Sequence, residues 1–350
     1  MKDLGTKHLV SRWPKTFRRS SQSVGSSAAV ISARKRIAVW AVIFGAIAAL
    51  IELPMPAEDA FKAARAELRQ YDAPQNIVVV AVDERSLSEL KVSQPSRVQD
   101  ARLVQHLFAA GAEQVVFDRA YADPRSPEED AAFANALERH RESVWLGASP
   151  VVDNGFHDHE GLLPAASLPK STNIASMMGQ SGPFGLSVRF PTSTNISDRE
   201  VPSISSVLAD YEGERAWYRP DLALDVRTIP TVSYVDVVTG SSTHDFAGKS
   251  VVVAPTHLSS KDFHNLPLGG KIAGVYFHVM GAHTLKDGVP VNLGWWPALL
   301  LVAGVLLSQI KNKRPSTATF WAAIACLPIT AVILDIYAVN IDVFPAAVAM

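Results

Sequence analysis

Cysteine is almost absent from this chain of 350 residues. The one cysteine, Cys326, lies inside a hydrophobic run. An intramolecular disulfide and a cysteine zinc cluster are therefore excluded, whereas an oxidising compartment is permitted. Charge is also sparse, at 19% of residues, and 33 Lys plus Arg are balanced by 34 Asp plus Glu. Because this balance gives no broad basic surface, nucleic acid is not expected as a partner.

Catalytic signatures are missing too. The sequence contains no HExxH zinc motif and no GxSxG nucleophile motif. Residues 248–250 are Gly-Lys-Ser, but Thr243 stands where a phosphate-binding loop needs its first glycine, and a predicted strand follows instead of a helix. Residues 157–160 are His-Asp-His-Glu, which we interpret as a solvated loop because helical ligand spacing is absent. We therefore expect no catalytic residue, no metal and no cofactor.

Apolar residues are abundant, at 48% of the chain, which exceeds the usual share in a soluble domain. Three runs concentrate them, at residues 37–53, 293–310 and 318–340. Each run is close to the length that a helix needs to cross a membrane. Trp295, Trp296 and Trp321 lie near run ends, where tryptophan suits the membrane–water boundary. Buried helices of a large soluble core are the alternative, which periodicity alone leaves open.

Basic residues predict which side of the membrane each segment occupies. Residues 1–36 carry many Lys and Arg but only one acid, Asp3, and the loop 311–317 is also basic. Both are expected in the cytoplasm, so residues 54–292 would lie in the periplasm of a multi-pass inner-membrane protein. A cleaved signal peptide is the alternative for the first run, but no small-residue cleavage site stands out before Pro54.

The region between the first two runs alternates strand and helix patterns. Predicted buried strands are residues 77–82, 114–117, 144–148 and 250–254. Predicted helices are residues 98–110, 129–140, 231–238 and 278–285. The alternation predicts an α/β domain with a largely parallel sheet flanked by helices. Residues 155–218, rich in Pro, Ser, Gly and Asn, are expected to form an irregular insertion of loops and short antiparallel strands.

A further helix is predicted directly after the first membrane run. Over residues 57–71, Phe61, Ala64, Leu68 and Tyr71 fall on one stripe. This apolar stripe could dock on the domain, or the helix could carry motion into the membrane.

Acidic residues follow two of the predicted strands. Asp83 and Asp118 each come at a strand end, and we expect these two ends to be neighbours in the sheet. Arg97 lies nearby in the sequence. Because ligands of open parallel sheets bind outside the carboxyl ends of strands, the two acids could bind a cation or amine and Arg97 a carboxylate. The alternative is that each acid caps the following helix or joins a structural ion pair.

The ordered motifs of this domain resemble the type-two CHASE domain, a bacterial extracellular sensor of membrane cyclases and kinases. The resemblance covers residues 76–288 and rests on the segments 80–87, 111–118, 229–240 and 248–249. Asp262 and His278 are similar to an acid and a closing histidine of that family. A tryptophan-proline-tryptophan stretch of the family is replaced by residues 93–97, so both aromatic rings are missing. The resemblance adds Asp262 and His278 to Asp83, Arg97 and Asp118 as candidate ligand-binding residues.

The resemblance implies a sensor that passes a periplasmic signal, either a small molecule or a protein, through the membrane to a cytoplasmic output domain or partner. Such outputs include cyclic-di-GMP enzymes, nucleotide cyclases and kinases, none of which has a motif here. An envelope scaffold and a membrane-tethered metal-dependent hydrolase are the alternatives, and a homodimer is left open. Residues 341–350 are expected to begin another apolar segment, and Asp335 is expected to face the headgroup region.

Overall fold

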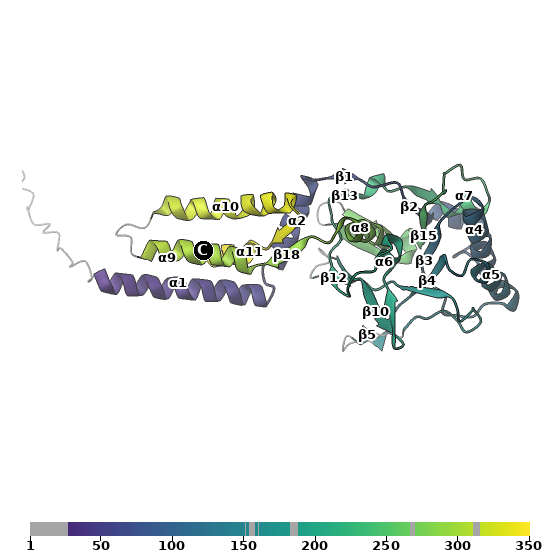
Figure 1. Cartoon of the computed structure of the whole chain (residues 1–350), viewed down its shortest axis with the longest axis horizontal. Helices are drawn as coiled ribbons and strands as arrows, with labels where there is room; N and C mark the ends of the chain where they lie inside the picture. The colour runs from purple at the N-terminus through teal and green to yellow at the C-terminus, as the bar shows by residue number, and fades with distance from the viewer. Residues whose placement is uncertain are drawn as a thin grey trace, which may run out of the picture.

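The computed structural model describes residues 27–150, 152–153, 158–159, 161–182, 188–266, 270–310 and 316–350. The tail before residue 27 and the side chains of the 157–160 motif lie outside these residues. The molecule is elongated, with apolar helices at one end and an α/β domain at the other (Figure 1). We call the helical end the bundle, and residues 71–288 the outer domain.

The bundle consists of α1 (Ser27–Leu50), α9 (Trp296–Ile310), α10 (Thr317–Ile336) and the short helix α11 (Phe344–Val348). Large apolar side chains on its outer faces are exposed, among them Trp40, Leu300 and Ile333. Such a surface is typical of contact with lipid. By length and composition α10 could cross a membrane, whereas α1 meets that test only together with α2 (Met55–Glu67), at a bend of 78°. Because α9 is shorter, the three predicted spans and their orientation stay predictions.

Two of the predicted apolar runs include residues that form a small sheet instead. The run 318–340 ends early, because α10 stops at Ile336 and Ala338 adopts a left-handed conformation with φ of 55°. The chain then forms β19 (Val339–Ile341), which pairs in parallel with β18 (Val291–Gly294). The backbone groups at the outer end of the bundle thus find partners where the two parts of the molecule meet.

The last apolar stretch, residues 341–350, returns to the bundle after β19. Its short helix α11 packs against α1 and α9. Gly45 of α1 permits this close approach, because a Cβ added there would stand 2.7 Å from the Cβ of Ala349.

The core of the outer domain is a six-stranded sheet in which all neighbouring strands are parallel, with the order β14-β2-β15-β3-β4-β7. The strands are β14 (Thr231–Ser233), β2 (Ile77–Val82), β15 (Ser250–Pro255), β3 (Gln114–Ala120), β4 (Val144–Ala148) and β7 (Asn173–Ser176). The three central strands, β2, β15 and β3, are rich in valine and buried on both faces, as parallel strands generally are. The predicted parallel sheet is therefore confirmed.

Helices cover both faces of this sheet (Figure 1). One face packs against α3 (Glu84–Leu90), α4 (Arg97–Ala109), α5 (Pro127–Arg139) and α7 (Tyr234–Val238). The other packs against α6 (Ile204–Ala209) and α8 (Gly274–Asp287). Asp83, Ser96 and Ser126 cap α3, α4 and α5, because each side chain accepts a hydrogen bond from a backbone amide of the first turn.

The edges of the sheet differ from the prediction. Residues 231–238 were expected to be wholly helical, but the first three form the edge strand β14 beside β2 and only the last five form α7. Within the predicted insertion, β7 extends the parallel sheet beyond β4, and α6 covers one face. Both segments are short, so pairing with a neighbouring strand decides their structure more than local pattern does.

The remaining strands form small two- or three-stranded sheets. They are β1 (Tyr71–Asp72) with β13 (Leu224–Asp225), β5 (Val152–Asp153) with β6 (Asp158–His159), β8 (Gln180–Ser181) with β9 (Val188–Pro191) and β12 (Trp217–Tyr218), β10 (Ser193–Ile196) with β11 (Arg199–Pro202), and β16 (Phe263–Leu266) with β17 (Gly270–Ala273). The two that lie wholly within the predicted insertion, β8-β9-β12 and β10-β11, are antiparallel as expected. Two short 3-10 turns, η2 (Val226–Thr228) and η3 (Leu258–Ser260), complete the described elements.

Candidate functional site

The first polar groups lie at an irregularity in the pairing of β3 with β4. Phe117 pairs with Leu146 and Ala120 with Gly147, so the two intervening residues of β3 have no partner in β4. Gly147 makes room for this bulge, because a Cβ added there would lie 2.9 Å from the carbonyl oxygen of Phe117. Side chains keep alternating between the two faces through this irregularity. Asp118 therefore faces α8 on one side of the sheet, and the next residue, an arginine, faces α4 on the other.

Three of the five predicted site residues lie together on the α8 side. The Asp118 Oδ1 atom is 3.9 Å from Nε2 of His278, and both side chains are buried. Asp262 lies against the start of α8, where a Cβ on Gly274 would stand 2.5 Å from its Oδ2 atom. His264 of β16 is 3.3 Å from Asp262, measured from Nε2 to Oδ1. Asp118 is not at the strand end as predicted, because β3 continues to Ala120. We call Asp118, Asp262, His264 and His278, which lie near that end, the strand-end cluster.

Burial sets the charges of the two inner residues. Removal from water raises the pKa of Asp118 to about 8, with a further contribution from the negative charge of Asp262. Burial likewise lowers the pKa of His278 to about 4, against the attraction of Asp262. The His264 imidazole lowers the pKa of Asp262. At neutral pH Asp118 is therefore a protonated acid, His278 is a neutral imidazole, and Asp262 is charged.

Two buried atoms of the strand-end cluster, Asp118 Oδ2 and His278 Nδ1, have no hydrogen-bond partner among the described residues. Buried polar atoms are usually paired, so these two are the places where a polar ligand or a water would attach. A protonated carboxyl group donates one hydrogen bond, and a neutral imidazole both donates and accepts. The pair can therefore bind a polar group or exchange a proton. Within the described part of the chain, no group of three or more His, Cys, Asp or Glu side chains is arranged to hold a metal ion.

Asp83 lies elsewhere. Because β15 separates β2 from β3, Asp83 and Asp118 are not at neighbouring strand ends as predicted. The Asp83 Oδ1 atom accepts hydrogen bonds from the Ser86 amide at 2.8 Å and from the hydroxyls of Ser86 and Ser233 at 2.6 and 2.9 Å. It therefore has the capping role that the sequence left open as an alternative.

Arg97 is also separate from the strand-end cluster, at the start of α4 on the opposite face of the sheet. Its buried guanidinium forms an ion pair with Asp130 of α5. It also donates to the carbonyl oxygens of Tyr121 at 3.1 Å and Asp123 at 2.6 Å. These contacts join α4, α5 and the segment after β3, so Arg97 neutralises Asp130 instead of the strand-end acids.

The sequence did not suggest a second buried ion pair on this face. Asp100 of α4 pairs with Arg119 and accepts hydrogen bonds from the hydroxyls of Tyr121 at 3.1 Å and Tyr234 at 2.9 Å. Burial raises the pKa of Asp100, and the Arg119 charge opposes that rise. The four residues come from α4, from β3 and the residue that follows it, and from α7, so only the tertiary fold brings them together.

A third group of charges lies on α2, between the outer domain and the bundle. The predicted apolar stripe is wrong in part. Phe61 does pack against Phe344, with ring centroids 5.9 Å apart, but the helix ends at Glu67, Leu68 is 74% exposed, and the buried face carries Glu58, Asp59 and Arg65. Their partners explain this pattern. Glu58 accepts hydrogen bonds from two backbone amides before and within α11, and Arg65 donates to the carbonyl oxygen of Ala331 in α10 at 3.0 Å. The surface under α2 thus offers polar backbone groups as well as apolar side chains.

Arg69, just after α2, connects both parts of the molecule. Its Nε atom donates to Oδ2 of Asp335 at the end of α10 at 2.8 Å, and its Nη2 atom lies 3.1 Å from Oδ1 of Asp221 in the outer domain. Asp335 was expected to face the headgroup region, but it is only 7% exposed and paired with protein. The physical reason is the cost of burying a carboxylate without a partner.

Two further ion pairs accompany the Arg69 bridge. Arg219 of the outer domain pairs with Asp59 of α2 at 2.6 Å. Lys62 of α2 pairs with Asp342, between β19 and α11, at 2.5 Å. We call these pairs and the Arg69 bridge the joint. The sequence did contain a signal for this charged helix face, because residues 58, 59, 62, 65 and 69 are charged at spacings of one helical face. The apolar stripe was given more weight in the prediction.

Comparison with known proteins gives one match. A family model described as "CHASE2 domain" matches residues 37–310. No curated protein and no solved structure matches the chain. The match covers the second part of α1, together with α2, the outer domain and α9, and therefore includes both the strand-end cluster and most of the joint.

Proposed function

Since the chain belongs to the CHASE2 domain family, whose members are extracellular sensor domains of membrane signalling proteins, we propose that it is a membrane-anchored periplasmic input module. In this proposal the outer domain receives the signal and the bundle crosses the inner membrane. The output is a cytoplasmic cyclic-di-GMP enzyme, nucleotide cyclase or kinase, on the same protein or on a partner. The chain itself then needs no catalytic site.

The observation that carries this proposal is the Arg69 bridge. One side chain contacts the outer domain at Asp221 and the end of α10 at Asp335. A shift of the outer domain relative to the bundle must break one of these contacts or move α10 with it. A residue with two such attachments can therefore bias the packing of the bundle, which is the physical requirement for coupling two sites.

The rest of the joint supports the same path. α2 follows α1 after a bend of 78° and is held on the bundle through Glu58 and Arg65. On its other side, Asp59 is paired with Arg219 of the outer domain. The outer domain is thus attached through charges and hydrogen bonds, which can exchange partners at lower cost than a packed apolar interface can rearrange.

The strand-end cluster is the proposed place of signal reception. It lies under the start of α8, and α8 leads directly to β18 and α9. Its unpartnered buried atoms favour a small polar signal over an apolar one. Asp118 and His278 are proposed to contact the signal, with Asp262 contributing charge, while Asp83 and Arg97 keep the structural contacts described above.

Paired spin labels in the full chain in nanodiscs test the proposal. Labels at Ser32→Cys and Thr319→Cys, with Cys326→Ser, report the distance between the ends of α1 and α10 remote from the outer domain (Figure 1). A thermal-shift screen of amino acids, dicarboxylates, sugars and polyamines supplies a compound that raises the Tm. We expect this compound to change the label distance. Arg69→Gln should keep the rise in Tm and lose the distance change, whereas Arg85→Gln, in an exposed pair within the outer domain, should keep both.

A label distance that does not respond to a bound compound would contradict transmission through the bundle. If the compound changes the label distance equally in Arg69→Gln, the joint is not the path by which the signal reaches the bundle. Loss of the rise in Tm in His278→Gln, with the fold retained, would support the strand-end cluster as the receiving site.

A further inference from the structure

A cavity of about 410 Å³ lies in the joint. Its walls come from α2, from the end of α10, and from the outer-domain strands β9 and β12 with the loop that follows β12. It is therefore located at the outer ends of the apolar helices, beside the predicted membrane surface. Its size is within the range of ligand-binding sites.

Most of the charges around this cavity are already paired. Lys62, Arg69 and Arg219 each contact a carboxylate of the joint. Arg189 also lines the cavity, but it has no ion pair and no side-chain hydrogen bond among the described residues. The cavity thus contains one basic side chain, Arg189, that contacts no carboxylate among the described residues.

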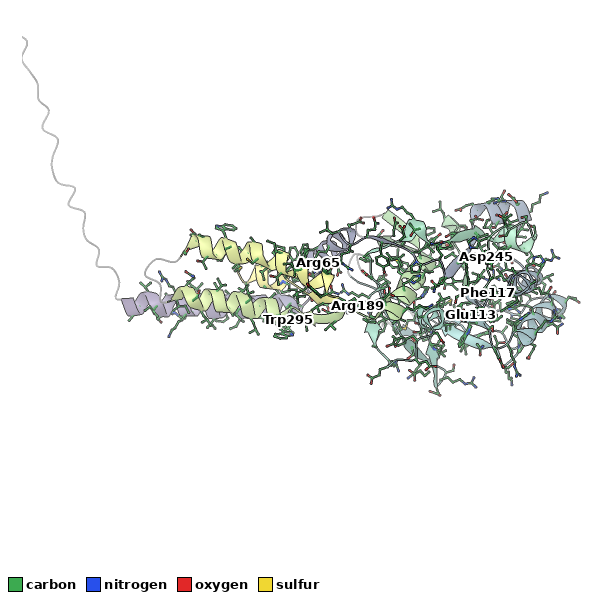
Figure 2. The ribbon with its side chains drawn as sticks, turned by 45° about the horizontal axis from the view of Figure 1, so that its top comes forward. Arg65, Glu113, Phe117, Arg189, Asp245 and Trp295 are labelled. Carbon is green, nitrogen blue, oxygen red and sulfur yellow. The ribbon has the colours of Figure 1, made fainter. Side chains whose placement is uncertain are left out.

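The position of Arg189 on β9 explains why its charge is available. Val188 and Phe190, its two neighbours, are buried in the core of the outer domain. Because side chains alternate along a strand, Arg189 leaves the core on the opposite side. Figure 2 shows it on the part of the outer domain that faces the bundle. A second donor is close, because Arg219 uses Nη1 for Asp59, while its Nη2 atom contacts, among the described residues, only the sulfur of Met55 at 3.7 Å.

The rim of the cavity is apolar and partly aromatic. Trp217 lines the cavity and is 50% exposed, and the exposed Val289 lines it beside Pro290. Trp296, at the start of α9, is also exposed. Tryptophan side chains at this level suit the region of lipid headgroups. A ligand that combines an anion with an attached apolar chain would match both the free arginine and this rim.

We propose that the cavity binds the phosphate of an anionic membrane phospholipid, with Arg189 as the main cation and Trp217 against the lipid's glycerol and upper acyl region. Arginine presents a planar set of donors that suits phosphate. Arg219 supplies the second contact through Nη2. Because the cavity also touches Arg69 and Asp335, lipid binding would stabilise the joint in its present arrangement. This inference rests on the membrane anchoring in the proposed function.

The test uses the full chain in detergent with added dioctanoyl phosphatidylglycerol, dioctanoyl phosphatidylcholine or glycerol phosphate. Phosphatidylglycerol is expected to raise the Tm by about 2–5 °C, and the other two compounds by much less. Arg189→Gln should need about tenfold more phosphatidylglycerol for the same rise. The matched control is Arg102→Gln, an exposed arginine of α4 at the far end of the outer domain, which should respond as the unaltered chain does.

A normal response of Arg189→Gln would overturn the proposal. An equal rise with glycerol phosphate would assign the cavity to a free anion and overturn the lipid source. If Arg189→Gln does not fold, native mass spectrometry of the unaltered chain decides, because phosphatidylglycerol should be retained after extraction and phosphatidylcholine should not. Membrane anchoring is tested separately, by alkaline phosphatase fused after Gly240 and after Arg314. If these fusions have the activities expected for a membrane-anchored chain but phosphatidylglycerol does not raise the Tm, the lipid inference is overturned and the proposed function is not.

Discussion

Arg69 and Asp335 are 266 residues apart in the sequence, yet Nε of the first donates to Oδ2 of the second at 2.8 Å. Asp335 is almost fully buried at the end of α10, and the described part of the chain offers it no other cation within ion-pair distance. The same guanidinium contacts Asp221 of the outer domain. One side chain therefore compensates two carboxylates in different parts of the molecule.

Replacing Arg69 should weaken the joint. In Arg69→Gln, both Asp335 and Asp221 lose their cation, and we expect the free energy of unfolding to fall by about 1–3 kcal/mol. Thermal melting of the full chain in detergent measures the effect. Arg85→Gln breaks an exposed pair and should leave the Tm nearly unchanged. Equal effects of the two substitutions would show that the Arg69 bridge adds nothing to stability.

Asp118 should make stability depend on pH. Its folded-state pKa of about 8 is above the ordinary value of 3.8, so between these values the folded chain holds a proton that the unfolded chain has lost. The stabilising contribution of this proton to the free energy of unfolding is therefore complete below pH 3.8 and is lost as pH rises towards 8. His278, with its pKa lowered to about 4, has the opposite effect, but that effect is complete above pH 6.5. The window from pH 6.5 to 9 consequently isolates Asp118 within this pair.

Asp118→Asn should remove that dependence. The Tm of the unaltered chain is expected to fall relative to Asp118→Asn between pH 6.5 and 9, while Asp262, His264 and His278 remain in both proteins. Glu113→Gln, at an exposed position just before the same strand, is the control and should follow the unaltered chain. Parallel melting curves for all three proteins across this range would contradict a buried, protonated Asp118.

The bulge beside Asp118 should depend on Gly147. A Cβ there would meet the carbonyl oxygen of Phe117 at 2.9 Å and the amide nitrogen of Arg119 at 3.0 Å, both backbone atoms that cannot easily move. Gly147→Ala is expected to cost about 1–3 kcal/mol of unfolding free energy. Gly304→Ala, inside α9, meets nothing within 4 Å and should not lower the stability. If Gly147→Ala melts like the unaltered chain, the bulge is not held by this contact.

Arg97 should prove structural. Arg97→Gln leaves Asp130 buried without its cation and should lower the free energy of unfolding by about 3 kcal/mol. A compound that binds the strand-end cluster should still bind with unchanged affinity, because Arg97 lies on the other face of the sheet. Isothermal titration below the lowered Tm checks this. A loss of affinity without a loss of stability would return Arg97 to the ligand site.

The orientation of the chain can be tested by fusions of alkaline phosphatase, which is active only outside the cytoplasm. A fusion after Gly240 is expected to be active, and one after Arg314 inactive, because the basic loop after α9 should stay inside. The opposite pair of results would reverse the proposed topology. Activity of both fusions would instead remove the second predicted span.

The sequence by itself determined the class of fold and most of its elements. Continuous valine runs such as residues 77–82 are too short for helices and too apolar for a half-exposed sheet, so a buried parallel sheet was predictable. The apolar runs flanked by basic residues likewise indicated the bundle. Asp118, Asp262 and His278 were identified as a group only because the family resemblance added the last two to the strand-end acid.

Only the tertiary structure decided which polar residues meet. Strand order depends on the packing of whole layers, and the insertion of β15 between β2 and β3 separated Asp83 from Asp118. Periodicity gave α2 an apolar stripe, whereas the actual helix buries Glu58, Asp59 and Arg65, because its partners are backbone groups and charges from segments far along the chain. Local sequence sets which backbone conformation is favourable, but the compensation of a buried charge depends on a partner that only folding brings near.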